Sequence, residues 1–126
     1  MKYPENLYYT KDHEWIFFMG VIALIGITDF AQKELGDIVY LDITALKETV
    51  EREKVFGTIE AVKTVSDLFM PVTGKILEVN QKIITQPQLI NKDPYGSGWL
   101  VKVIPTNINN KEGLLAATEY KKLIGA

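Results

Sequence analysis

The sequence has no cysteine, one histidine and one arginine among its 126 residues. Without cysteine, disulfides, thiolate nucleophiles and zinc–thiolate sites are excluded. The lone histidine, His13, cannot build a multi-histidine centre, so we expect no metal site. Arginine binds phosphate through a bidentate fork, and Arg52 is the only one present, which argues against a nucleotide-binding protein.

Long apolar runs and a strong excess of one charge are absent as well. The longest apolar run, residues 21–25, is far too short to cross a bilayer, and the polar, aromatic start of the chain lacks the pattern of a signal peptide. A net charge of −2 and a pI near 5.4 give no attraction to nucleic acid or to an anionic membrane. We therefore expect a cytoplasmic, monomeric protein in which residues 1–126 form one domain.

The sequence does contain short apolar stretches separated by turn residues, which is the pattern of a mainly β protein. Alternation of apolar and polar residues places Val39, Leu41 and Ile43 on one face of a strand, and Leu77 and Val79 on one face of another. These strands predict a β-sandwich or flattened barrel with a core over about 14–104. The predicted strands cover residues 16–19, 21–26, 37–43, 55–62, 67–72, 75–80 and 99–104.

A short helix is predicted at 29–35. Thr28 or Asp29 caps its start, Asp29 with Gln32 fits a capping box, and Gly36 supplies a left-handed end.

The remaining segments predict a helical tail and two connections. Asn110 is expected to cap a helix running to about residue 117, and Thr118 a second one with Tyr120, Leu123 and Ile124 buried, which together make a tail over about 110–125. Residues 81–98 hold several prolines and glycines and predict a long, extended connection. The highly charged segment 44–54 predicts an exposed loop with an edge strand.

The most specific feature is Lys63, which lies between the apolar arms 55–62 and 67–72. Lysine is depleted in β-rich segments, and β-branched neighbours stiffen the backbone around this one. The pattern places a primary amine at the tip of a hairpin, within reach of a modifying enzyme. The alternative is an ordinary solvated lysine, and these observations leave both open.

Four residues beside this lysine are candidates for recognition by a modifying enzyme or a partner. They combine two flanking carboxylates with the two β-branched neighbours of the lysine. These residues are Glu60, Val62, Thr64 and Asp67.

His13 and Glu14 could suggest acid–base catalysis. No nucleophile stands ready in the sequence to complete a relay with them, so we predict no catalytic residue. The simpler interpretation is that Trp15 packs at the start of a strand while His13 and Glu14 face water or bind backbone.

Taken in order, the motifs of the chain resemble those of the glycine cleavage system H proteins, a family of lipoyl carriers. The similarity covers nearly the whole length. The motifs lie at residues 12–16, 26–32, 35–39, 60–63, 66–67, 71–74 and 91–102.

This resemblance implies a barrel-sandwich hybrid, the fold of lipoyl and biotinyl domains, and a lipoate joined to Lys63 by an amide bond. Biotinyl carriers usually flank the lysine with methionine, whereas Val62 and Thr64 stand here. The implied role is that of a non-catalytic carrier. It moves the aminomethyl group of decarboxylated glycine between a pyridoxal-phosphate glycine decarboxylase, an aminomethyltransferase and dihydrolipoyl dehydrogenase, after a lipoate ligase or octanoyltransferase has modified it.

The chain departs from the family in segment 44–54. Members of the family commonly have one glycine where Lys47 stands and another where Glu53 stands. If these positions need a positive φ, a side chain there costs roughly 1 kcal/mol, so we expect the loop to be remodelled. This change supports an alternative, in which an H-like lipoyl carrier serves lipoate relay or heterodisulfide-reductase-like sulfur oxidation.

Overall fold

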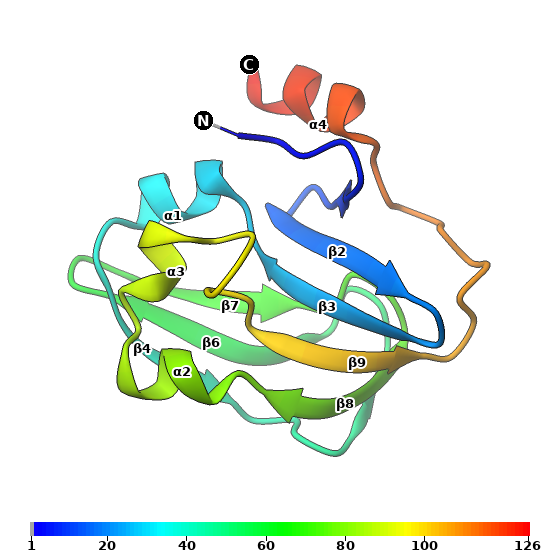
Figure 1. Ribbon diagram of the computed structural model, residues 1–126, viewed down its shortest axis with the longest axis horizontal. Helices are drawn as coiled ribbons and strands as arrows, with labels where there is room; N and C mark the ends of the chain where they lie inside the picture. Colours follow the sequence, from blue (N-terminus) through cyan, green and yellow to red (C-terminus); the bar gives the residue numbers. More distant parts are fainter. Residues whose placement is uncertain (1) are drawn as a thin grey trace.

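The computed structural model describes residues 2–126, and its main feature is two antiparallel sheets packed against each other (Figure 1). This architecture confirms the predicted mainly β, flattened sandwich. The larger sheet has the strand order β1 (Tyr8–Tyr9), β2 (Glu14–Met19), β3 (Ile22–Ile27), β9 (Val101–Pro105), β8 (Gly74–Val79) and β5 (Thr49–Val50). The smaller sheet has the order β4 (Ile38–Ile43), β6 (Val55–Ala61) and β7 (Val65–Phe69).

The core lies between the two sheets. Phe56 and Ile59 of β6 point inward and are almost fully buried, and they belong to the same apolar cluster as Ile25 and Ile76 of the larger sheet. Burying each such side chain contributes about 1.5–3 kcal/mol. The β6–β7 hairpin is therefore fixed to the sandwich along its base, and its tip extends from a rigid support.

Two strands contain bulges, and in both strands some side chains face the opposite way from the prediction. In β4 the register shifts between Ile38 and Tyr40, so Val39 is exposed, contrary to the prediction. In β8 the register shifts between Ile76 and Glu78, so Ile76 is fully buried and Leu77 is not part of the core. A bulge adds one residue to one strand and reverses the alternation that follows it.

Three short helices gather at the end of the sandwich where the β6–β7 hairpin turns (Figure 1). Helix α1 (Asp29–Leu35) has the predicted bounds. Its cap is Thr28, whose hydroxyl accepts from the N–H of Ala31, while Gln32 donates to the Asp29 side chain and closes no capping box. Helices α2 (Gln81–Thr85) and α3 (Leu89–Lys92) replace the extended connection predicted for 81–98, which was wrong.

The C-terminal region contains one helix, α4 (Ala117–Ile124), which lies beside the N-terminal segment (Figure 1). Residues 110–116 contain a turn at 112–113 and an isolated β-bridge from Leu115 to Tyr9 instead of the predicted helix. Helix α4 begins after Ala116, whose N–H donates to the carboxylate of Glu119, so Thr118 is not the cap. Tyr120 is fully buried as predicted, whereas Leu123 is 53% exposed.

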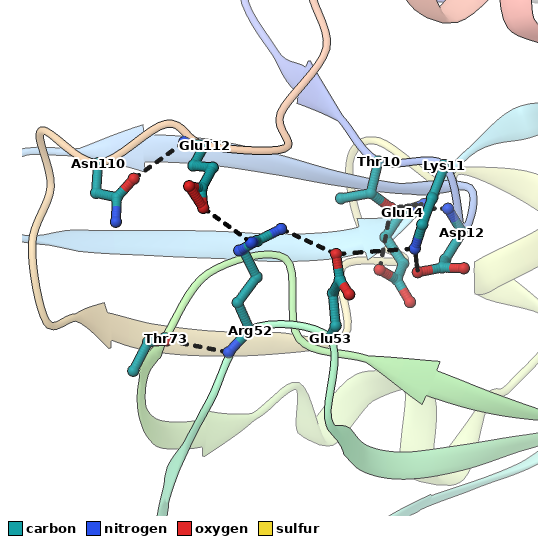
Figure 2. Close-up of polar contacts among 9 residues, drawn as sticks. All are labelled: Thr10, Lys11, Asp12, Glu14, Arg52, Glu53, Thr73, Asn110 and Glu112. Atoms are coloured by element: carbon teal, nitrogen blue, oxygen red, sulfur yellow. Dashed lines mark hydrogen bonds and ion pairs between the residues drawn. The ribbon is translucent and has the colours of Figure 1, made fainter.

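The loop between β4 and β6 has two residues with a positive φ, and neither of them is glycine. Lys47 has φ 70° and Glu53 has φ 71°, the left-handed conformation that glycine adopts without strain. The expectation of a remodelled loop was wrong at these two positions, because both residues take the strained conformation itself. For Glu53 there is a compensating contact, since its carboxylate lies 2.9 Å from Arg52 Nη1 and 3.9 Å from Lys11 Nζ (Figure 2).

Lys47 has no such ion pair among residues 2–126, so Lys47→Gly should relieve strain without losing a contact. We expect the free energy of unfolding to rise by about 1 kcal/mol. Urea denaturation measures this change. The matched control is Lys54→Gly, which lies at a negative φ and should destabilise the protein; equal effects of the two substitutions would contradict the strain argument.

Candidate functional site

The tip of the β6–β7 hairpin presents Lys63 to solvent. The last rung is a bond from the N–H of Ala61 to the carbonyl of Thr64 at 2.7 Å, and the N–H of Val62 donates to the carbonyl of Asp37 at 2.9 Å. Together these bonds fix the backbone on both sides of the lysine. Lys63 is exposed, and it forms no ion pair within residues 2–126.

Gly36 provides the surface under the lysine side chain. This glycine ends α1 with φ 79°, and a Cβ built on it would lie 3.4 Å from Lys63 Cε and 3.8 Å from Lys63 Nζ. A side chain larger than that of alanine would therefore compete for space with the end of the lysine side chain. An acyl group fits this site well, because the amine is exposed, has no ion-pair partner among the described residues 2–126, and lies over a residue without a side chain.

The four predicted recognition residues surround the lysine on the surface. Val62 is 75% exposed, and Glu60, Thr64 and Asp67 are also exposed. Glu60 pairs with Val65 across the hairpin, and Val65 is itself 60% exposed. The surface around the lysine thus combines carboxylates with exposed valines. Carboxylates attract a basic partner during association, and the valines offer apolar area that the partner can bury.

A cavity of about 450 Å³ lies next to the hairpin. Its walls come from the segment before β2 and the first residue of β2, from the end of β3, from helix α1 and from strands β6 and β7. Apolar groups form part of it, and four carboxyl groups together with His13 and Ser66 form the polar part. The lining residues are Asp12, His13, Glu14, Ile27, Phe30, Ala31, Glu34, Leu35, Ile59, Ser66, Asp67 and Leu68.

Glu14 is the most deeply placed of the four carboxyl groups. It is 2% exposed, and its two oxygens accept from the hydroxyl of Thr10 at 3.2 Å and from the N–H of Phe69 at 2.8 Å; Figure 2 shows the Thr10 contact. Burial raises the pKa of Glu14 to about 8. Of the two environments expected for this residue, water or backbone, the structure has the second, because the carboxyl group binds the backbone at the end of β7.

His13 is held in place by both its backbone and its ring. Its backbone has φ 68°, its N–H donates to the carbonyl of Thr10, and its carbonyl accepts from the N–H of Thr28. Its Nδ1 lies 2.9 Å from the hydroxyl of Tyr120, and its ring centroid lies 4.8 Å from that of Phe30. Burial lowers the pKa of His13, an effect that Asp12 and Glu34 partly oppose.

The sequence drew attention to His13, Glu14 and Asp67 but gave no sign that they share a cavity. The remaining lining residues were missed. The structure brings the three together because β2 and β7 lie in different sheets whose ends meet here.

Comparison with known proteins identifies the family. The family pattern described as Glycine cleavage H-protein matches residues 7–126. The chain belongs to this family. A glycine cleavage system H protein of Bacteroides thetaiotaomicron is 53% identical over 98% of each chain, and one of Carboxydothermus hydrogenoformans is 47% identical over 96% of this chain and 93% of that protein. The crystal structure of a glycine cleavage system H protein from Mycobacterium marinum matches with a TM-score of 0.88 and 40% identity, covering 98% and 99% of the two chains.

Two further findings concern the described residues only. No helix within residues 2–126 is long and apolar enough to cross a membrane. In the same part of the chain, no cluster of three or more His, Cys, Asp or Glu side chains could hold a metal ion.

Proposed function

We propose that this H-protein family member is the lipoyl-lysine carrier of a glycine cleavage system, with lipoate attached to Lys63. In this role it moves the aminomethyl group of decarboxylated glycine from a pyridoxal-phosphate glycine decarboxylase to an aminomethyltransferase, and dihydrolipoyl dehydrogenase restores the disulfide. The observation that carries the proposal is the exposed amine of Lys63, which forms no ion pair with residues 2–126 and lies at the tip of a braced hairpin. We expect no catalytic residue, a monomer of one domain over 1–126, and a cytoplasmic location.

When bound, lipoate supplies a disulfide that takes up the aminomethyl group at one sulfur and is reduced at the other. The protein chain determines where this disulfide can reach. About twelve bonds separate the lysine Cα from the first sulfur, which gives a reach of about 14 Å. Because the hairpin root is rigid, that reach sweeps a small volume and raises the effective concentration of the arm at a docked enzyme.

The cavity beside the hairpin lies within the same reach. Asp67 lines it and is four residues from Lys63, a separation of at most about 14 Å along an extended strand. Carboxyl groups at the mouth favour a cationic amine, and the apolar wall of Leu35 and Ile59 excludes water. We infer that the loaded arm folds into this cavity between partners, which protects the cargo from hydrolysis.

Recognition by the partners and by the lipoate-attaching enzyme uses the surface around the lysine. Val62, Thr64 and the nearby Val65 offer apolar contact, and Glu60 and Asp67 offer charge. Acylation of Lys63 removes one positive charge and takes the formal net charge of the chain from −2 to −3. The complementary surface of each partner should therefore be basic.

The attachment site is tested by intact-mass measurement. The chain is expressed with lipoate and a lipoate ligase, and the protein is then digested to locate the modification. We expect one lipoyl increment, on the peptide that contains Lys63. An unmodified chain, or an increment on another lysine, would overturn the proposal. The relatives cited above are all named for glycine cleavage, so a lipoyl carrier of sulfur oxidation or lipoate relay has no specific support here.

A further inference from the structure

Helix α4 reaches the cavity beside Lys63 through one side chain. Tyr120 is fully buried, and its hydroxyl lies 2.9 Å from His13 Nδ1 and 2.8 Å from Thr28 Oγ1. His13 lines the cavity, whereas Tyr120 and Thr28 lie behind it. The C-terminal helix is therefore linked to the cavity wall by the bond between Tyr120 and His13, and Thr28, Tyr120 and His13 form a series with Tyr120 in the middle.

The hydrogens in this series have one consistent arrangement. Thr28 Oγ1 already accepts from the N–H of Ala31, and within residues 2–126 its own hydrogen has a single acceptor in reach, the oxygen of Tyr120. Thr28 is fully buried, so leaving that hydrogen unpaired would be costly. Thr28 therefore donates to Tyr120, and Tyr120 donates to His13 Nδ1.

Because Nδ1 accepts a hydrogen bond, the tautomer and charge of the imidazole are defined. A neutral ring that accepts at Nδ1 carries its hydrogen on Nε2. Protonation of Nδ1 would make the ring a donor to Tyr120, and one hydrogen of the series, that of Thr28 or that of Tyr120, would then lack an acceptor among residues 2–126, so the series also favours the neutral ring. The lowering of the His13 pKa by burial acts in the same direction, against Asp12 and Glu34.

The cavity contains few donors for an acceptor that enters it. Asp12, Glu34 and Asp67 contribute oxygens, and the hydroxyl of Ser66 donates to the carbonyl of Asp67. Glu14 has a raised pKa of about 8 and therefore carries a proton near neutral pH, but it is only 2% exposed and presents little donor surface to the cavity. His13 is the one lining side chain with a ring N–H. A cationic amine would be held by the carboxylates, but a reduced sulfur needs a donor.

We propose that Tyr120 is a positioning residue for His13: it binds Nδ1 of the neutral ring, so that the Nε2 hydrogen is available in the cavity to a sulfur of the lipoyl arm. This inference rests on the proposed function for its acceptor. The strained φ of His13 is consistent with it, because such conformations persist where the surrounding structure fixes a side chain for use.

The positioning step is tested without any modification of Lys63. Since His13 is the only histidine, ¹⁵N-labelled histidine gives one pair of ring signals. At pH 7.5 the native chain should show an unprotonated Nδ1 and a protonated Nε2. In Tyr120→Phe the ratio of this tautomer to the other should fall about fivefold, the change expected for loss of one hydrogen bond.

Tyr9→Phe is the matched control. Tyr9 is equally buried, its ring lies 4.9 Å from that of Tyr120, and its hydroxyl donates to the carbonyl of Pro4 at 2.6 Å without contacting His13. It should keep the native tautomer ratio. An unchanged ratio in Tyr120→Phe, or a native ring protonated at Nδ1, would overturn the inference.

The acceptor is tested by comparing two acyl groups on Lys63. The reduced lipoyl chain should shift the Nε2 signal of His13, while the octanoyl chain, which has the same length but no sulfur, should not. The shift should be lost in Tyr120→Phe and kept in Tyr9→Phe. If the Nε2 signal of the lipoylated chain behaves like that of the octanoylated chain, this inference alone is overturned. If Lys63 accepts no lipoyl group at all, the proposed function is overturned, and with it the sulfur as the acceptor for His13.

Discussion

Lys63→Arg should abolish carrier activity completely while leaving the fold intact. In reconstitution with glycine decarboxylase, the lipoylated native chain should support exchange of labelled bicarbonate into glycine, and the variant should support none. The guanidinium keeps the positive charge but offers no amine that can form the amide. Because the side chain is exposed and contributes nothing to the core, we expect the free energy of unfolding to change by less than about 0.5 kcal/mol.

The control is Lys82→Arg, an exposed lysine on α2 outside both the hairpin and the cavity. It should be lipoylated and should keep full exchange activity. Residual exchange with Lys63→Arg would show that another residue carries the arm. A lipoylated native chain without any exchange would reject the glycine cleavage pathway while retaining the attachment site.

Local signals in the sequence were sufficient for α1 and for the presence of the hairpin, although its second strand is Val65–Phe69 and not the predicted 67–72. The strand arms around Lys63 depend on apolar alternation over a few residues, and α1 depends on a hydroxyl at its start and a glycine at its end. Each of these signals lies within the element that it specifies. The position of Lys63 at an exposed tip therefore follows from the sequence with no knowledge of the rest of the fold.

Other features depend on contacts between distant segments, and these could not be predicted. The bulges at Val39 and Leu77 arise from pairing with β6 and β9, so a strict alternation rule failed there. Helix α2 had a readable signal in Asn80, whose side chain accepts from the N–H of Lys82, but the prolines nearby outweighed it. In the same way, residues 110–116 have a capping residue, but Leu115 pairs with Tyr9 in an isolated β-bridge, a distant contact that no local signal shows.

The cavity illustrates the same limit at the candidate site. Its residues come from three stretches, 12–14, 27–35 and 59–68, which only the packing of the two sheets brings together. Glu14 and Phe69 are joined by a hydrogen bond across 55 positions of the chain. No spacing rule connects them, because the link depends on how β2 and β7 meet.

The second large effect concerns that buried carboxyl group. Glu14 has an ordinary pKa of 4.5 in the unfolded chain and about 8 in the folded one, since burial disfavours its charge. Between these two pH values the folded state binds more protons than the unfolded state. The contribution of Glu14 to the free energy of unfolding is therefore greatest below pH 4.5, and it falls as the pH rises toward 8. With about 1.4 kcal/mol for each pKa unit, the loss is on the order of 5 kcal/mol.

Glu14→Gln should remove this dependence. Glutamine has the same shape, and its carbonyl can accept from the N–H of Phe69, so the variant should fold and should lose about 1 kcal/mol at pH 5 from the weaker contact with Thr10. At pH 9 the order should reverse, because the native chain then holds an ionised carboxylate in the interior and the variant does not. Urea denaturation at a series of pH values from 5 to 9 measures both curves.

Glu48→Gln provides the comparison, because this glutamate is exposed and removing its charge should leave the native slope unchanged. If Glu14→Gln and the native chain lose stability in parallel over the whole series, the buried carboxyl group does not titrate in this range. If the native chain is still the more stable of the two at pH 9, the hydrogen bonds from Thr10 and Phe69 outweigh burial and hold Glu14 ionised. In that case the cavity beside Lys63 contains a permanent negative charge at its base, and its preference for a cationic cargo no longer depends on pH.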